Sequence, residues 1–322
     1  MEDDELYPRM IHEEFNDSVS ISPITKGVYK IIDSNWKKPK YVKIWPDSSK
    51  SELEELISIE DDIGMPRHKV IKENPHIVVM DSASGDSLSK ILFKYLAPGV
   101  WSIYRQDLVQ KFEKLGHTIG QIHNKTQRGS QSLNPLSLSF DRYSAITADG
   151  LADFVQDIIC DTAVAWIESQ LPELSDNDIP TCIVHGDLML FHVYMGEDGR
   201  ISLIDFDNAK KAPFIEDIVR FTSALELYIE RIPYATRSQF HQLRSAFERG
   251  YNETGLVYTI DQSIFDLFRA IRHCSMLSYY HFDMESGLLN SGEFSIQERA
   301  KHRLLRRIDT KVLKRIISRL AS

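Results

Sequence analysis

The sequence has few cysteines and no long apolar run. Its three cysteines, at positions 160, 182 and 274, are far apart and lie among apolar residues. Such spacing forms neither a disulfide framework nor a metal-binding set, so we expect reduced cysteines in the core. No apolar run approaches the roughly 18 residues that cross a bilayer, and the acidic N-terminus lacks a hydrophobic signal core. We therefore expect a cytoplasmic protein that has no membrane partner.

Positive charge is also scarce. The chain has 38 Lys and Arg residues against 47 Asp and Glu residues, which gives a net charge of −9 at pH 7. This balance argues against a nucleic-acid partner and would suit a cationic small molecule, although an acidic surface also serves solubility. The 322 residues, 42% of them hydrophobic, are enough for two lobes with substantial cores.

Two short apolar runs in the middle of the chain each lead into an aspartate. Residues 182–184 precede His185-Gly186-Asp187, and residues 201–204 precede Asp205. Because both aspartates follow strand ends in neighbouring segments, we expect their carboxylates to face one pocket. Such carboxylates repel each other unless a divalent cation or a shared proton relieves the repulsion. Phosphoryl transfer uses such a pair: one carboxylate takes the proton of the attacking hydroxyl and the other holds magnesium. The alternative is a pair of aspartates that merely form turns.

The remaining patterns predict an α+β fold. Residues 18–45 and 69–80 contain runs of β-branched residues separated by turn residues, which favours an antiparallel sheet. Residues 51–63 have the spacing of a short amphipathic helix. We expect the first 16 residues to form a frayed or loosely docked arm. Helical patterns dominate from Leu88 onward and predict helices over residues 107–124, 151–171, 215–231, 239–250, 262–280 and 296–320.

The segments HGDLMLFH and IDFD resemble the catalytic loop and the metal loop of the aminoglycoside phosphotransferase and choline kinase superfamily. That superfamily has a two-lobed protein-kinase-like fold and the pattern H-G-D-x-x-x-x-N followed by I-D-F/W-D/E. The resemblance implies a small antiparallel-sheet lobe and a large, mainly helical lobe. It also implies that Asp187 is the catalytic base, that Asp205 is the principal metal ligand and that ATP and Mg²⁺ are the cofactors. Asp217 stands where members often carry a structural aspartate.

One position departs from this pattern. The asparagine of the superfamily, which is its second metal contact, falls at His192. Magnesium prefers oxygen ligands, so an imidazole is a poor substitute for an amide oxygen. Three outcomes stay open: Asp205 holds the ion together with water and phosphate oxygens, His192 favours a softer metal such as Mn²⁺, or the enzyme is slow.

The N-terminal residues resemble a nucleotide-binding lobe. Lys43 in YVKIW resembles the strand lysine that contacts the α and β phosphates, although it could equally be an exposed position of a half-buried strand. The resemblance implies that Glu52 or Glu55, on the following helix, pairs with Lys43. The phosphate-covering loop would be residues 22–27, which contain one glycine and no G-x-G-x-x-G. The hinge backbone expected to bind adenine is that of Val79, Met80 and Asp81.

These assignments divide the chain into two lobes. Residues 1–81 are predicted to form the nucleotide-binding lobe, with the hinge near residues 79–83. Residues 82–322 are predicted to form the helical lobe that holds the catalytic and metal loops.

The sequence thus predicts an ATP-dependent phosphotransferase that moves the γ-phosphate to a hydroxyl of a small molecule, such as an aminoglycoside, an amino alcohol or a homoserine-like compound. Asp283 and Glu285 are candidates for holding an amine of that acceptor. An atypical Ser/Thr protein kinase is the first alternative, but Met189 and Asp207 replace a lysine and a glycine of standard protein kinases. A degenerate nucleotide-binding module, in which His192 has removed the metal chemistry, is the second.

Overall fold

The computed structural model describes residues 2–15, 19–25, 27–36, 38–44, 50–63, 68–73, 76–132, 169, 178–254, 262, 265–266, 268–270, 272–273 and 296–320. The predicted helix over residues 151–171 lies almost wholly outside this part, and so do the candidate acceptor residues Asp283 and Glu285. Cys160 and Cys274 lie outside it as well. Cys182 is a buried free thiol, as predicted, and burial raises its pKa well above the ordinary value.

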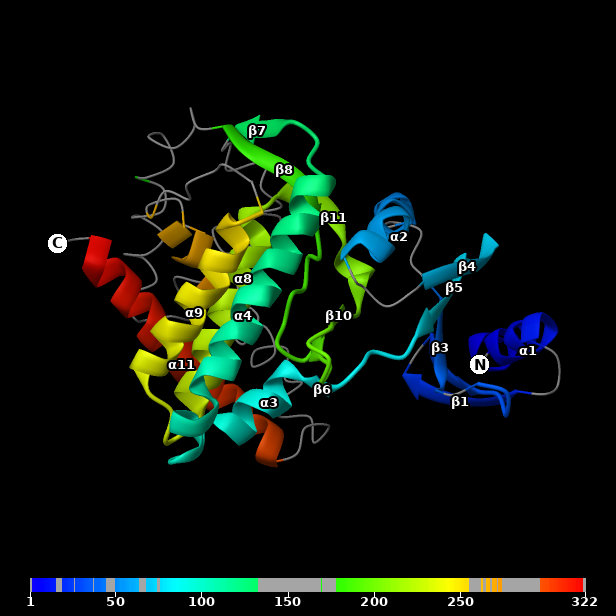
Figure 1. The fold of residues 1–322 in the computed structure, drawn as a ribbon, viewed down its shortest axis with the longest axis horizontal. Coiled ribbons are helices and arrows are strands. Elements are labelled where there is room, and N and C mark those ends of the chain that lie inside the picture. Colours follow the sequence, from blue (N-terminus) through cyan, green and yellow to red (C-terminus); the bar gives the residue numbers. More distant parts are fainter. Residues whose placement is uncertain are drawn as a thin grey trace.

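An antiparallel five-stranded sheet forms the N-terminal part of the chain (Figure 1). Its spatial order is β1-β2-β3-β5-β4, with β1 Ser20–Thr25, β2 Val28–Ile32, β3 Lys40–Ile44, β4 His68–Glu73 and β5 His76–Asp81. Successive side chains of a strand point to opposite faces. Val42 and Val79 pair across β3 and β5 and are buried on one face, whereas Lys43 and Val78 pair on the other. This alternation decides the face to which Lys43 points.

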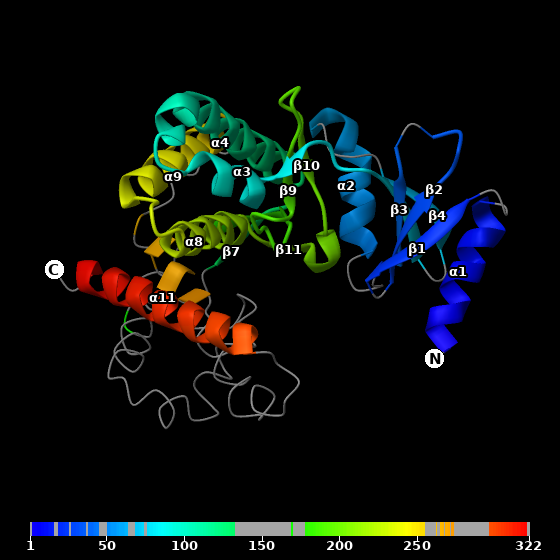
Figure 2. The same ribbon diagram turned by 90° about the horizontal axis from the view of Figure 1, so that it is seen from below.

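Helix α1, Glu2–Phe15, packs against the Val42 face of the sheet (Figures 1 and 2). Ile11 is fully buried in one apolar cluster with Tyr29 and Val42. Phe15 packs edge-on against Trp36, with 5.9 Å between the ring centroids. The expectation of a loosely docked arm is therefore wrong, because an apolar helix face covers this side of the sheet.

Helix α2, Lys50–Ile63, connects the opposite face of the sheet to the helical part of the chain. Leu53, Leu56 and Val78 belong to the same apolar cluster as the C-terminal helices. Glu55 on α2 also pairs with Arg128, at 2.9 Å between Oε1 and the guanidinium. Packed side chains thus join the sheet to the rest of the protein, and the division of the chain at residues 81 and 82 stays a prediction.

Helices make up most of the C-terminal part, as predicted. They include α3 Leu88–Tyr95, α4 Val100–Lys125, α8 Ile215–Arg231, α9 Arg237–Asn252 and α11 Ile296–Leu320. One small sheet contains β6 Asp86–Ser87, β9 Val193–Met195 and β10 Ile201–Leu203, and the other contains β7 Ser130–Ser132, β8 Asp178–Val184 and β11 Lys210–Pro213. A sheet followed by helices is the α+β fold that the sequence predicts.

Glycines let α4 and α9 pack with their backbones in contact. A Cβ atom added to Gly250 would lie 1.7 Å from the carbonyl oxygen of Glu113, and one added to Gly116 would lie 1.9 Å from that of Phe247. Both distances are far shorter than a van der Waals contact. No residue with a side chain fits at these two positions without a shift of one helix against the other.

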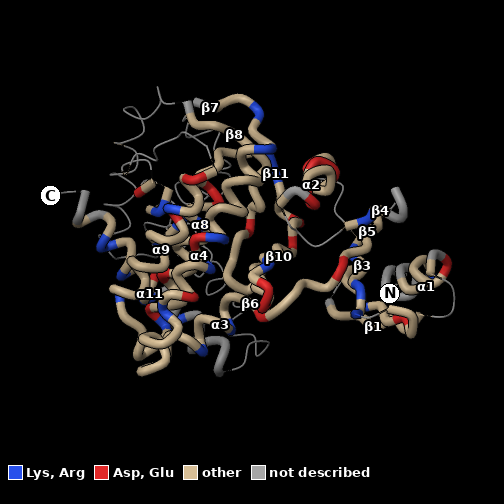
Figure 3. The backbone as a smooth tube through the Cα atoms, viewed as in Figure 1, with Lys and Arg blue, Asp and Glu red and all other residues tan. Residues whose placement is uncertain are grey.

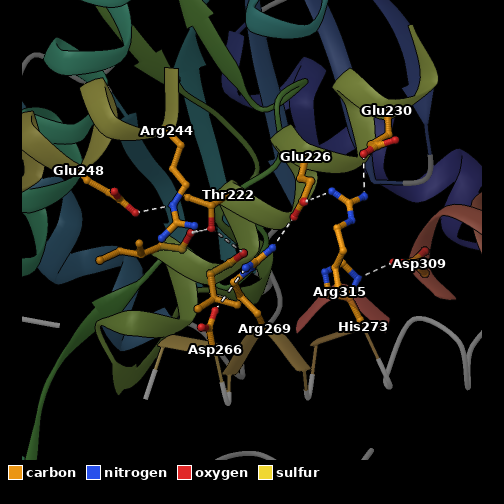
Figure 4. Close-up of polar contacts among 12 residues, drawn as sticks. Thr222, Glu226, Glu230, Arg244, Glu248, Asp266, Arg269, His273, Asp309 and Arg315 are labelled. Carbon is orange, nitrogen blue, oxygen red and sulfur yellow. Dashed lines mark hydrogen bonds and ion pairs between the residues drawn. The ribbon is translucent and has the colours of Figure 1, made fainter. Parts of the chain in front are cut away.

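Helix α8 is tied to α11 by a network of ion pairs (Figure 4). Arg315 on α11 bonds Glu226 at 3.3 Å and Glu230 at 2.7 Å. Arg269 also forms an ion pair with Glu226. Arg269 and Glu226 are each at least nine-tenths buried. Burial raises the pKa of Glu230, but hydrogen bonds from Lys311 and Arg315 hold it below the ordinary value. Removing one member of such a buried network leaves an uncompensated charge, so the network fixes the position of α8.

Lys and Arg residues are interspersed with Asp and Glu residues along the described helical part of the chain (Figure 3). None of the described helices is long and apolar enough to span a membrane.

We predict that Gly250→Ala destabilises the protein even though alanine is the better helix former. Helix propensity alone favours alanine by about 1 kcal/mol, whereas forcing a methyl group into a filled space costs roughly 1–3 kcal/mol. The contact with Glu113 leaves no room for the methyl group, so the clash should dominate. Urea denaturation should show a lower midpoint with an unchanged slope. Ser245→Ala, at an exposed position of the same helix, is the control and should change little; a Gly250→Ala protein as stable as wild type would contradict the close packing.

Candidate active site

A sharp turn follows β8 and carries Asp187. Gly186 has a φ of +74°, and a Cβ atom there would lie 1.9 Å from the carbonyl oxygen of Asn208. Glycine is therefore required, both by the backbone conformation and by the close approach of the two loops. The turn places residues 185–187, the start of the catalytic loop, directly beside the segment that contains Asp205 and Asp207.

The carboxylate of Asp217 holds this turn in place. Asp217 lies in the first turn of α8, is 1% exposed and accepts the backbone N–H groups of His185, at 2.7 Å, and Gly186, at 3.1 Å. It also lies 3.2 Å from His123 Nε2, which belongs to α4. Burial raises the pKa of Asp217, but these hydrogen bonds and the nearby histidines hold it below the ordinary value. Asp217 is thus a structural aspartate, as its position in the sequence indicates.

His185 links the turn that carries Asp187 to the segment that carries Asp205. Its Nε2 atom donates to the carbonyl oxygen of Ile204 at 2.9 Å, and its Nδ1 atom accepts the N–H of Asp187 at 3.3 Å. Both bonds require the neutral ring with its proton on Nε2. Burial lowers the pKa of His185, which agrees with a neutral imidazole. The histidine of the HGD sequence is therefore a buried connector rather than a reacting group.

Asp205 follows β10 and has an unusual backbone conformation. Its φ is +70°, the one positive φ among the described residues other than glycine. Such a conformation costs energy and is found most often at functional sites. A short 3₁₀ helix, η2 Phe206–Asn208, follows directly and carries Asp207.

Lys43 lies between the carboxylates of Asp205 and Asp207. Its Nζ atom is 2.6 Å from Asp205 Oδ1 and 2.5 Å from Asp207 Oδ1. Burial raises the pKa of Asp205, but the hydrogen bond and the charge of Lys43 outweigh this and lower it. The lysine of the N-terminal sheet thus contacts two carboxylates of the predicted metal loop, a segment far along the chain, and reduces the repulsion between them.

His192 bridges the catalytic loop and the metal loop. Its Nδ1 atom donates to the carbonyl oxygen of Asp187 at 2.7 Å, and its Nε2 atom lies 3.3 Å from Asp205 Oδ2. On the far side, Arg220 of α8 donates to Asp187 Oδ1 at 3.0 Å. One continuous series of polar contacts therefore runs from Lys43 through Asp205, His192 and Asp187 to Arg220.

The other predicted nucleotide residues lie around this series. Glu55 pairs with Arg128, and Glu52 accepts a hydrogen bond from Ser51 at 2.7 Å, so the pairing of either glutamate with Lys43 stays a prediction. Val79, Met80 and Asp81 end strand β5, which lies between β3 and the edge strand β4. The pairing with β4 stops at Met80, whereas Asp81 still pairs with β3.

Sequence reasoning missed two members of the site. Asp207 was assigned no role, although it belongs to the IDFD segment and contacts Lys43 as closely as Asp205 does. Arg220 was not considered at all. The available signal was its position three residues after Asp217, since residues three apart share one face of a helix.

The oxygen atoms at this site suit a hard divalent cation. Asp205 and Asp207 supply carboxylates that already bind the cationic Nζ of Lys43. Within the residues that the structure describes, no three His, Cys, Asp or Glu side chains gather into a complete ligand set. A cation here would therefore be held by the two aspartates and by oxygen atoms from outside the protein, which is the usual arrangement for magnesium with a nucleotide.

The comparison with protein-family models identifies the family of this chain. The model of the phosphotransferase enzyme family matches residues 80–252, more than half of the chain. No curated protein sequence matches this chain. Among solved structures, the choline kinase of Streptococcus pneumoniae is 14% identical, with a TM-score of 0.58 over 98% of this chain and 99% of the other.

Two further structures have the same fold. An amicoumacin kinase, solved in complex with AMP-PNP, Ca²⁺ and Ami, is 19% identical, with a TM-score of 0.63 over 96% of this chain and 94% of the other. An ethanolamine kinase of Plasmodium vivax is 12% identical, with a TM-score of 0.58 over 96% and 87% of the two chains. At such identities these likenesses concern the fold, whereas the matched family model identifies the chain as a member of the phosphotransferase enzyme family.

Proposed function

We propose that this protein transfers the γ-phosphoryl group of ATP to a hydroxyl of a small molecule. The observation that carries the proposal is the series of polar contacts that joins Lys43, Asp205, His192, Asp187 and Arg220. It supplies, within one continuous site, a cation for phosphates, oxygen atoms for a divalent ion and a carboxylate for a proton. The family and the fold support the same reaction class.

Asp187 is the proposed general base. Arg220 bonds its Oδ1 atom, so Oδ2 is the oxygen that we expect to accept the acceptor proton. As that proton leaves, the hydroxyl oxygen bonds to the γ-phosphorus, the bond from that phosphorus to the β,γ-bridging oxygen breaks, and ADP departs with the electron pair. Arg220 and the bond from His192 to the Asp187 carbonyl hold the carboxylate in position, which is the larger part of catalysis in phosphoryl transfer.

Lys43, Asp205 and Asp207 are the proposed phosphate and metal residues. A bound Mg²⁺ would neutralise charge on the phosphates. The two aspartates would hold it by their carboxylate oxygens, and His192 would lie within reach of the same ion through Nε2, where a nitrogen ligand favours Mn²⁺. Adenine would bind the hinge backbone. Because β4 pairs with β5 only as far as Met80, we expect the backbone of Asp81 and of the residues that follow it to contact adenine.

The structure favours a small-molecule acceptor over a protein acceptor. Only the short 3₁₀ helix η2, strand β11 and short turns separate Asp205 from the first turn of α8, and β11 is paired along its whole length with β8. A protein kinase needs a long activation segment at this place to bind its substrate. The solved structures of similar fold include kinases named for choline, ethanolamine and amicoumacin, which are all small molecules.

We predict that Asp187→Asn abolishes phosphoryl transfer and leaves nucleotide binding largely intact. The amide cannot take the acceptor proton, and loss of a general base typically costs about 10²- to 10⁴-fold in rate. The measurement is ADP release with a panel of aminoglycosides, choline-like amines, homoserine and other amino alcohols, together with ATP affinity by calorimetry. Asp198→Asn, in the exposed turn between β9 and β10, is the matched control. Full activity in Asp187→Asn would refute the assignment of the base.

We predict that Lys43→Met has opposite effects on nucleotide and on cation binding. ATP affinity should fall because the phosphates lose their cationic partner. The affinity of Mn²⁺ alone should rise by several-fold, since the ammonium group no longer competes for Asp205 and Asp207. Water-proton relaxation measures Mn²⁺ binding directly. Lys40→Met, on the same strand and paired with Asp81, is the control; unchanged Mn²⁺ affinity in Lys43→Met would argue against a metal site at these carboxylates.

Thermal unfolding with ATP separates the enzyme from a degenerate binding module. We predict that ATP stabilises the wild-type protein only weakly without a divalent cation and strongly with it, because the cation joins the phosphates to Asp205 and Asp207. Stabilisation follows the ratio of ligand concentration to Kd. Equal stabilisation with and without Mg²⁺ would support the binding module instead.

A further inference from the structure

A cavity of about 510 Å³ opens beside the catalytic loop. It lies between α3, α8 and residues 189–191, which follow Asp187 by two to four positions. Cavities of this size hold small organic molecules. The described metal and phosphate residues take no part in its lining, so the cavity has room for a different ligand.

One face of α8 connects the proposed base to this cavity. Arg220, which bonds Asp187, is followed at helical spacing by Ala224, Leu227 and Arg231, which line the cavity. Residues at such intervals share one face of a helix. Seven residues of helix span roughly 10 Å, so a molecule with its hydroxyl at Asp187 would extend along this face as far as Leu227. The opposite face of α8, with Glu226 and Glu230, is occupied by α11.

The walls of the cavity are apolar and aromatic. Phe93 of α3 is 63% exposed, and Phe191 of the catalytic loop is 51% exposed. Two large aromatic side chains left open to solvent in one cavity mark a binding surface rather than a core. Tyr228 is fixed in the wall, because its hydroxyl donates to the carbonyl oxygen of Ser89 at 2.6 Å, so its ring and not its hydroxyl is available to a ligand.

The described lining of the cavity contains no Asp or Glu side chain. Its two basic residues are Arg231 and Lys90, and Lys90 pairs with Asp86 at 2.6 Å. A cationic acceptor would therefore find no carboxylate among the described lining residues to bind its amine. This differs from the cationic acceptor that the net charge of the sequence suggests.

We propose that this cavity binds the acceptor and selects a hydroxyl compound with an apolar or aromatic body and no cationic group. The inference rests on the proposed function, since it names the substrate class of the same site. The acceptor hydroxyl lies at Asp187 and gives up its proton there, while its body packs between Phe93 and Phe191.

The first test compares two kinds of acceptor. Phenyl β-D-glucopyranoside and 2-phenylethanol are the aromatic probes, and choline, ethanolamine and kanamycin are the cationic ones. ADP release should give a kcat/KM at least about tenfold higher for an aromatic probe, the scale of one well-packed aromatic contact. Transfer to the cationic probes but not to the aromatic ones would overturn the inference and leave the proposed function standing.

The second test changes the cavity. Phe93→Ala and Phe191→Ala should each raise KM for the aromatic probe by roughly tenfold. In Phe93→Ala, kcat and ATP affinity should change little, since this variant removes a contact made equally before and during transfer; Phe191→Ala also removes a ring contact with His192, so only its KM is compared. Ile103→Ala, which removes an exposed apolar side chain outside the cavity, should change nothing. Unchanged KM values in both phenylalanine variants would refute the cavity as the acceptor site.

The third test measures binding without turnover. Saturation-transfer NMR of phenyl β-D-glucopyranoside should show binding to wild-type protein, competition by 2-phenylethanol and loss of signal in Phe191→Ala. Binding without transfer to any hydroxyl, in a protein that ATP does not stabilise, would refute the proposed function but retain the cavity. No binding of this probe to the wild-type protein would overturn the inference.

Discussion

A single buried carboxylate organises the site. Asp217 begins α8 and accepts two backbone N–H groups from the turn that precedes Asp187. These N–H groups lie in a sharp turn after β8 and have no strand to bond, so without Asp217 they would be buried and unpaired. The same carboxylate lies against His123 of α4. The catalytic loop is therefore fixed to two helices before any ligand arrives.

Lys43 offsets part of the negative charge in the site. Asp205 and Asp207 would repel each other in the absence of a cation, and Lys43 supplies one from a different part of the chain. This arrangement makes the ammonium of Lys43 and a divalent ion competitors for the same oxygens. Binding of a nucleotide would offer Lys43 an alternative partner in the phosphates and so release the carboxylates. Nucleotide and metal would then bind cooperatively. The phosphates would draw Lys43 away from the two carboxylates, and the metal would replace the positive charge that Lys43 supplies there.

The sequence predicted the fold and most of the site, but for different reasons. Strand and helix patterns gave the sheet and the helices, and short-range motifs gave Asp187, Asp205 and Lys43. Helix α1 was missed because its many acidic residues make its apolar face hard to recognise in the sequence. Ile11, on that face, is fully buried. Arg220 was missed because its importance depends on a contact with Asp187 across the fold, whereas its spacing from Asp217 indicates only that the two residues share a helix face. The roles of these residues stay proposals, whereas their proximity is a property of the structure.

Helix α8 shows how one element can serve several requirements at once. Asp217 in its first turn fixes the catalytic loop, Arg220 one turn later orients Asp187, and Leu227 lines the cavity beyond. Its opposite face is held by the ion pairs to Arg315. Net charge could not reveal the character of the cavity, because the charge of a whole chain says nothing about the few side chains on one helix face. If the cavity binds the acceptor as proposed, the side chains that α8 places beside Asp187 decide the acceptor chemistry, and a change of two or three of them would alter the acceptor without disturbing the loop that Asp217 holds.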